Sequence, residues 1–355
     1  MNPAVLDHGA LRLRVQAALD GFLAGQRAHL AAVSPDLAPL VDVLADLVTG
    51  GKRLRPAFCY WGHLAAGGQD SAELVVAATA LEVFQACALI HDDVMDGSDT
   101  RRGRPAVHRR FAALHTEHGW VRDADGFGTG AAILLGDLCL GWSADLLDTC
   151  GLSADAIARG RPVLSEMRAE VTAGQYLDLL EQARGGGSVE TALRVVRYKA
   201  AKYTVERPLL LGAALAGADA ALCSAFTAYG VPLGEAFQLR DDLLGVFGDP
   251  AETGKPAGDD LREGKRTVLV AAALEKADAA QADVVRRHLG DPRLDAAGVA
   301  DLREVLLDTG AVDRVEQLVG ELLETALTAL AAAPVEETAR GVLAELAVAA
   351  TSRRY

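Results

Sequence analysis

The spacing of apolar residues constrains the fold more than any other feature of this 355-residue chain. Apolar side chains recur every three or four positions through most segments, as at Leu74, Ala77, Ala78, Leu81 and Phe84, and alternating β-branched stretches are nearly absent. Ala and Leu dominate the composition, and these residues lose the least free energy on entering a helix. We therefore predict an all-α fold.

Glycine and proline occur in short clusters, for example at 50–51, 97–105 and 185–187, and none of these is long enough to be a flexible linker. We therefore predict a single all-α domain over residues 1–355, built as one large helical bundle around a central cavity. Its motif-bearing core covers about 50–267, and a helical C-terminal tail covers 271–355.

Charge and hydropathy exclude several classes of protein. The net charge of −14 argues against general binding to nucleic acid, which depends on Lys and Arg neutralising phosphates. We expect no transmembrane segment, because no run nears the roughly 18 uncharged apolar residues of a membrane span. No signal peptide is evident, so we expect a cytoplasmic protein. The five cysteines lack CxxC spacing and are interpreted as buried thiols.

Two acidic motifs are similar to each other: LIHDDVMD, which ends at Asp96, and FQLRDDLLG, which ends at Gly245. Asp92 and Asp96 are four positions apart, so on a helix they lie on one face. Carboxylates at this spacing suit Mg²⁺, which combines one or two of them with phosphate oxygens and water. The alternative for an isolated DDxxD motif is a solvated acidic helix end.

Two basic clusters lie close to glycine and proline. Arg101 and Arg102 follow the first acidic motif in TRRGRP, and guanidinium groups bind phosphate oxygens in a fork geometry. Upstream, GGKRLRP places Lys52 and Arg55 about one helical turn apart with no acidic residue beside them. The sequence therefore predicts two diphosphate sites, one that uses metal and one that does not.

Five segments in this order identify a family: GGKRLRP, HDDVMDGSDTRRGRP, GQYLDL, YKAAKYTVERPLLLG and FQLRDDLLGVFGD with GKPAGDDLREGKRT. Together they closely resemble the trans-isoprenyl diphosphate synthases of the polyprenyl synthetase family, most of all its bacterial geranylgeranyl diphosphate synthases of actinobacterial type. The resemblance implies the isoprenoid synthase fold, a homodimer, and head-to-tail condensation of isopentenyl diphosphate with an allylic diphosphate (dimethylallyl, geranyl or farnesyl). The reaction would pass through an allylic carbocation stabilised by Mg²⁺.

The resemblance also implies roles for individual residues. The metal ligands would be Asp92, Asp93, Asp96, Asp241 and Asp242. The allylic diphosphate would be held by Arg101, Lys199 and Lys255, and isopentenyl diphosphate by Lys52, Arg55, Gln85 and Arg102. The amide oxygen of Gln238 would solvate the carbocation. The catalytic set would therefore be Asp92, Asp96, Arg101, Lys199, Gln238 and Asp241.

The chain departs from the family pattern at two positions. Gly245 replaces the usual last Asp of the second motif, and Ala200 replaces the usual Thr or Ser after the lysine at 199. A non-catalytic partner subunit would keep the fold and lose motif residues, but only these two are lost here. A terpene cyclase, the other alternative, has no use for a metal-free diphosphate site.

Product length should depend on the helix that leads into Asp92. Cys87 and Ala88 are small, and the next bulky residues, Phe84 and Leu81, would lie roughly 12 and 16 Å below the metal at 1.5 Å per residue. We therefore predict geranylgeranyl diphosphate, with twenty carbons, and keep fifteen and twenty-five carbons as alternatives. Phe84 could instead pack in the core while another helix closes the channel.

Overall fold

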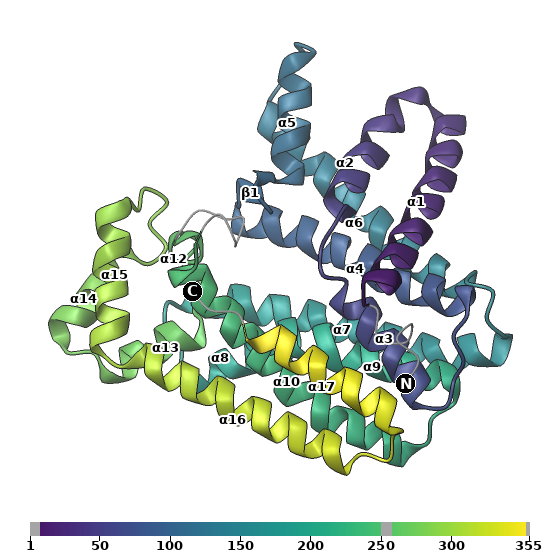
Figure 1. The fold of residues 1–355 in the computed structure, drawn as a ribbon. Helices are drawn as coiled ribbons and strands as arrows, with labels where there is room; N and C mark the ends of the chain where they lie inside the picture. Colours follow the sequence, from purple (N-terminus) through teal and green to yellow (C-terminus); the bar gives the residue numbers. More distant parts are fainter. Residues whose placement is uncertain (1–7, 250–257, 353–355) are drawn as a thin grey trace. The chain divides into compact units, whose positions relative to one another are not determined.

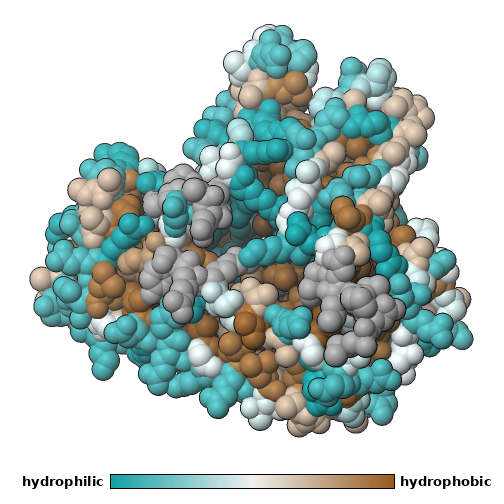
Figure 2. Space-filling view, in the orientation of Figure 1, coloured by the Kyte–Doolittle hydropathy of each residue, from teal (hydrophilic) through white to brown (hydrophobic). Residues whose placement is uncertain are grey.

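The computed structural model describes residues 8–249 and 258–352 (Figure 1). The predicted all-α fold is confirmed, because helices make up most of the described chain. The strands in this part of the chain are a single antiparallel pair of two residues each, β1 (Thr100–Arg101) and β2 (Arg104–Pro105). Hydrophilic residues cover most of the face in view in Figure 2.

The chain divides into two compact units, the first comprising Met1–Leu164 with Leu211–Ala218 and the second Ser165–Leu210 with Asp219–Tyr355. That residues 1–355 form a single domain stays a prediction. The first unit contains α1 (His8–Val33), η2 (Pro35–Leu37), α2 (Ala38–Val48), α3 (Leu54–Ala65), α4 (Ala72–Asp96), α5 (Val107–Glu117), α6 (Ala124–Asp148), the start of α7 (Ala154–Arg184) and the end of α9 (Arg207–Ala216).

Helix α4 forms the centre of the first unit. It packs most extensively on α6 and also contacts α1, α2, α3 and α5. Its side chains Leu74, Leu81 and Ile90 are fully buried. The residues that end this helix are therefore held by packing on several sides.

Helices α4 and α6 are both long and apolar enough to cross a membrane by length and composition, which we did not anticipate from the sequence. In α4, 72% of the apolar stretch is buried inside the protein, so packing accounts for its composition. In α6 the buried share is 44%, and apolar side chains are exposed at Phe127, Ile133, Leu134 and Leu140.

The second unit is built around α10 (Ala220–Phe247), which packs along α16 (Figure 1). It also packs against the π-helix η3. Its other elements are the rest of α7 and α9, α8 (Val189–Val195), η3 (Val196–Glu206), α12 (Asp259–Arg262), α13 (Val268–Lys276), α14 (Ala279–His288), α15 (Ala296–Asp308), α16 (Ala311–Ala332) and α17 (Glu337–Thr351). Buried residues of α10, α13, α15 and α16 share one apolar core.

Candidate active site

The first acidic motif ends α4. The helix begins after Ser71, whose hydroxyl accepts a hydrogen bond from the amide of Leu74 (3.1 Å), and ends at Gly97 in the left-handed conformation (φ 66°). Asp92, Asp93 and Asp96 therefore lie at the C-terminal end, where the helix dipole is negative and further negative charge is unfavourable. This end of the helix requires cations.

Arg101 supplies one of those cations. Its Nε donates to Oδ1 of Asp93 (2.9 Å), and its guanidinium also lies 3.4 Å from Oδ2 of Asp92. Asp93 is almost fully buried, and the side chain of Asp92 is 15% exposed. The structure thus brings together three residues that the sequence assigned to the metal and to the allylic diphosphate.

The loop that presents these arginines is a β-hairpin, which the sequence did not predict. Arg101 pairs with Arg104 across the two strands, so Arg102 and Gly103 form a two-residue turn. Both have positive φ (54° and 72°), as a type I′ turn requires. The turn directs Arg101 and Arg102 apart, and they have different partners.

Arg102 reaches the GGKRLRP loop. Its Nη1 donates to the carbonyl of Leu47 (3.1 Å), and a Cβ on Gly51 would lie 3.8 Å from its guanidinium. Partial desolvation lowers the pKa of Arg102, and the carboxylate of Glu82 raises it. The nearby guanidinium groups of Arg53, Arg101 and Arg55 also lower this pKa. The two basic clusters predicted from the sequence therefore converge within the first unit.

The remaining predicted ligands of isopentenyl diphosphate lie in the same unit. Lys52 is exposed just before α3, Arg55 lies in the first turn of that helix, and Gln85 is half-buried on α4. The metal-free site predicted from the sequence can thus be built from residues of one unit.

In the second unit, α10 carries the second acidic motif. Asp242 is buried, and its pKa is raised to about 7, mainly by burial and in smaller part by the nearby carboxylates of Asp260 and Asp241. Gln238 Nε2 donates to Oδ1 of Asp242 (2.8 Å), and this hydrogen bond lowers the pKa. The amide predicted to solvate the carbocation is thus bound to a carboxylate one turn away, and its catalytic role stays a prediction.

Lys199 lies in η3, and π-helical segments are frequent at functional sites. Its Nζ donates to Oδ2 of Asp178 (2.6 Å), a buried residue of the GQYLDL segment. A Cβ on Gly174 would lie 2.3 Å from the amide nitrogen of Lys199, so only glycine permits this approach of α7 to η3. Ala200, the departure from the family pattern, is buried. We did not assign Asp178 to the lysine from the sequence, although it shares the GQYLDL segment.

At the second departure, Gly245, a carboxylate from another helix fills the space that a side chain would need. A Cβ at 245 would lie only 1.9 Å from Oδ2 of Asp260, on the short helix α12. Lys265 binds Glu263 (2.6 Å) and lies 3.4 Å from Oδ1 of Asp260. We assigned no role to these residues from the sequence, although they share one segment with the predicted ligand Lys255, which lies outside the described residues.

Helix α12 is held in place by α15 and the loop before it. Arg262 donates to the carbonyl of Leu294 (3.1 Å), and a Cβ on Gly258 would meet the side chain of Val299 at 2.9 Å. Arg303 of α15 donates to the carbonyl of Val246 (2.8 Å), near the end of α10. These contacts fix Asp260 relative to α10.

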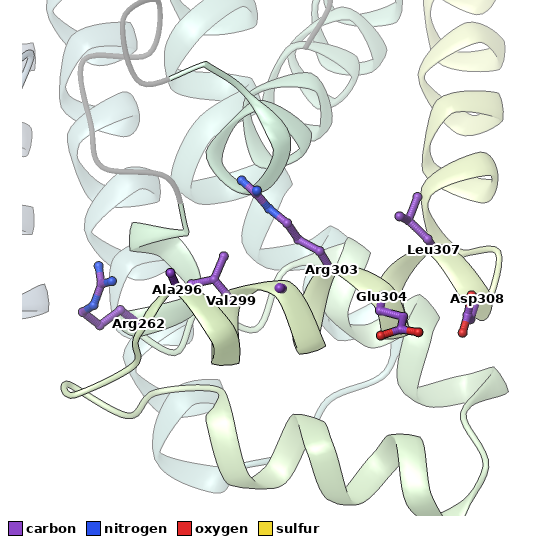
Figure 3. A pocket seen from close by; sticks show the side chains of 8 residues that line it. Arg262, Ala296, Val299, Arg303, Glu304, Leu307 and Asp308 are labelled. Atoms are coloured by element: carbon purple, nitrogen blue, oxygen red, sulfur yellow. The ribbon is translucent and has the colours of Figure 1, made fainter.

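The same region contains a pocket of about 520 Å³ (Figure 3). None of the predicted site residues within the described part of the chain lines it; its walls are Arg262, Ala296, Val299, Ala300, Arg303, Glu304, Leu307 and Asp308. Arg262 and Arg303 both bind backbone carbonyls. The pocket therefore adjoins the contacts that support α10 and α12, and it is not the predicted active site.

The donor set fits magnesium. Within residues 8–249 and 258–352, no group of three or more His, Cys, Asp or Glu side chains is arranged to hold a metal by itself. The predicted ligands are all carboxylates, with Asp92 and Asp96 in the first unit and Asp241 in the second. Mg²⁺ commonly takes one or two carboxylates and completes its shell with phosphate oxygens and water.

The predicted chain-length residues lie on α4. Leu81, Phe84 and Cys87 are buried, and Ala88 is half-buried. Cys87 Sγ lies 3.8 Å from Nδ1 of His91. Burial is compatible with lining a channel and with packing in the core, so their role in product length stays a prediction.

Carboxylates that end α4, an arginine paired with them and a separate basic cluster lie in the first unit, and a second acidic helix lies in the second. The polyprenyl synthetase family model matches residues 38–306, and the chain belongs to this family. It is therefore a trans-prenyltransferase.

The chain is similar to proteins from several organisms. A crystal structure of geranylgeranyl pyrophosphate synthase from Corynebacterium glutamicum, complexed with isoprenyl diphosphate and magnesium, is 44% identical, with a TM-score of 0.95 over 98% of this chain and 100% of that chain. Geranylgeranyl diphosphate synthase of Mycobacterium tuberculosis is 33% identical over 79% of this chain and 75% of the relative. Geranylfarnesyl diphosphate synthase of Aeropyrum pernix is also 33% identical, over 80% and 84%.

Proposed function

We propose that this enzyme condenses isopentenyl diphosphate with an allylic diphosphate in a Mg²⁺-dependent reaction and releases geranylgeranyl diphosphate. The observation that supports this most directly is the pairing of two unlike anion sites around α4. One combines Asp92 and Asp93 with Arg101; the other has basic predicted ligands and brings Arg102 beside Gly51 of the loop that carries Lys52. Two such sites suit one diphosphate that leaves and one that is only held.

Each group has a distinct part in the proposed reaction. When bound, Mg²⁺ supplies charge neutralisation for the departing pyrophosphate. Arg101 and Lys199 hold the oxygens of that pyrophosphate, which stabilises the negative charge that develops in the transition state. Lys52, Arg55, Arg102 and Gln85 hold isopentenyl diphosphate so that its double bond attacks the allylic carbocation. Loss of a proton, taken by the released pyrophosphate, then restores an alkene.

A twenty-carbon product is supported by the small residues Cys87 and Ala88 above the buried Phe84 on α4. It is also supported by the similar enzymes from Corynebacterium and Mycobacterium, both named for geranylgeranyl diphosphate. The Aeropyrum relative is named for the twenty-five-carbon geranylfarnesyl product. Twenty-five carbons is therefore the main alternative, and fifteen the other.

The test is incubation of purified protein with isopentenyl diphosphate, Mg²⁺ and each of the three short allylic primers, followed by chain-length analysis. We expect geranylgeranyl diphosphate as the main product, and loss of activity after chelation that Mg²⁺ restores. Asp92→Ala serves as the inactive control. Activity that survives complete chelation would refute the mechanism, and binding of one substrate without turnover would favour a non-catalytic subunit.

We also propose a homodimer, as the family resemblance implies, formed through the exposed face of α6. That face presents Phe127, Ile133, Leu134 and Leu140, with Gly130 and Gly141 to allow close approach. Analytical ultracentrifugation should show a dimer that Leu134→Glu converts to a monomer. Leu307→Glu, an equally drastic change at another exposed leucine, is the control and should stay dimeric. A cytoplasmic location stays a prediction from the sequence, and cell fractionation tests it.

A further inference from the structure

We infer that Arg53 is a positioning residue for isopentenyl diphosphate. Together with Glu82 it forms a buried ion pair, here called the clamp, that fixes the conformation of the loop carrying Lys52 and Arg55. This inference rests on the proposed function, because it takes these two residues as ligands of the substrate. Arg53 itself does not contact the diphosphate in this assignment.

The backbone at Arg53 is unusual. Its φ is 54°, a left-handed conformation that is unfavourable for a non-glycine residue. In the described part of the chain, the other non-glycine residues with positive φ are Arg102 and Arg122. Two of the three therefore belong to the basic clusters, and such conformations persist only where the surroundings hold them.

The side chain of Arg53 shows what holds it. Its guanidinium forms an ion pair with Glu82, and the two side chains are only 3% and 4% exposed. The same guanidinium donates to the carbonyl of Val48 at the end of α2 and to Oε1 of Gln16 on α1, the latter at 2.6 Å. One side chain thus joins α1, α2 and α4 at the start of α3.

The clamp is connected to each predicted ligand of isopentenyl diphosphate. Lys52 directly precedes Arg53 in the chain, and Arg55 follows it by two residues. On α4, Gln85 lies three residues after Glu82 and therefore on the same side of the helix. Arg102 binds the carbonyl of Leu47, which precedes the carbonyl that Arg53 binds. A shift of the clamp would therefore displace all four ligands relative to each other.

Glu82 also provides the charge balance of this site. The guanidinium groups of the two basic clusters lie close enough to lower the pKa of Arg102, and Glu82 is the carboxylate that opposes them. A buried ion pair is costly to break from one side, because the remaining charge loses its partner. The geometry and charge of the basic site therefore depend on both members of the pair.

The test compares Arg53→Lys, Arg53→Gly and Glu82→Gln. Lysine keeps the charge and the backbone preference but cannot bridge Glu82, Val48 and Gln16 at once. Glycine removes the guanidinium and relieves the backbone strain. For each variant we would measure KM for both substrates, kcat, calorimetric binding of isopentenyl diphosphate without metal, and the melting temperature.

We expect each variant to weaken isopentenyl diphosphate about tenfold or more, the effect of losing one charge-assisted contact. The KM for the allylic substrate should stay within about twofold of wild type, since its site does not use the clamp. The matched control is Arg340→Lys, because Arg340 also binds several backbone carbonyls but lies in α17, far from the predicted ligands in sequence. It should lower the melting temperature and leave both KM values unchanged.

An unchanged affinity for isopentenyl diphosphate in Arg53→Gly would overturn the inference, because the guanidinium would then be dispensable. Equal increases in both KM values, matching those of Arg340→Lys, would also overturn it in favour of a purely structural role. If Arg53→Gly does not fold, Glu82→Gln decides by the same two measurements. A wild-type protein that neither binds nor consumes isopentenyl diphosphate would refute the proposed function, and the clamp assignment with it.

Discussion

Restoring the family's usual aspartate at position 245 should destabilise this enzyme. Any side chain at 245 would place its Cβ 1.9 Å from Oδ2 of Asp260, whereas real contacts of this kind are rarely below 3.0 Å. The backbone that carries Asp260 is fixed, because Arg262 binds the carbonyl of Leu294 and Gly258 lies close to Val299, so relief of the clash requires rotation of the Asp260 side chain. A second carboxylate would also join a group that already includes the buried Asp242.

Overpacking of this kind costs about 1–3 kcal/mol, and like-charge repulsion adds to it. At about 2.1 cal/mol/K of unfolding entropy per residue, 1 kcal/mol corresponds to roughly 1.3 °C for this 355-residue chain, so Gly245→Asp should lower the melting temperature by roughly 1–4 °C. Gly245→Ala should show the steric part alone. The double variant Gly245→Asp with Asp260→Gly should recover most of the loss, because it empties the space that the new side chain needs.

Thermal unfolding followed by circular dichroism, without metal or substrate, measures these effects. Gly341→Asp is the control: it lies in helix α17 with nothing within 4 Å of the added Cβ, and should change stability by under about 0.5 kcal/mol. If Gly245→Asp melts at the wild-type temperature, or if removing Asp260 fails to rescue it, then Asp260 does not occupy the space at 245.

Three further predictions follow from α4, the basic residues and Asp242. Cys87→Phe should shift the product to fifteen carbons and Phe84→Ala should lengthen it; unchanged products by chromatography would mean that α4 does not set the length. Lys52→Ala should raise KM for isopentenyl diphosphate alone, and Lys199→Ala KM for the allylic substrate alone, each roughly 10- to 150-fold; a reversed pattern would invert the assignment. Because Asp242 has a pKa of about 7 when folded and 3.8 ordinarily, the folded chain keeps a proton that the unfolded chain loses. The free energy of unfolding should therefore fall as pH rises from about 4 to 7, and Asp242→Asn should flatten that fall in denaturant titrations at several pH values.

The helical fold and the first acidic motif could be predicted because they depend on local spacing. A four-residue separation places Asp92 and Asp96 on one helix face whatever surrounds the helix, and the structure confirms that α4 contains both. The nearby basic residues were also identifiable, since their charge type and order along the chain are local properties. The turn at Arg102 was missed, because its positive φ becomes evident only when the two strands pair.

Tertiary packing determines which charged side chains pair with each other. Arg53 and Glu82 are 29 residues apart, and Lys199 and Asp178 are 21 apart, so no local period predicts either pair. The space at Gly245 is likewise filled from another helix by Asp260, although in the sequence position 245 simply lacks a carboxylate. Spacing along one helix determines which side chains share a face, whereas the partner of a buried charge depends on how separate helices pack. The sequence alone therefore identified the reaction class, and only the tertiary structure showed how the residues that carry it are held.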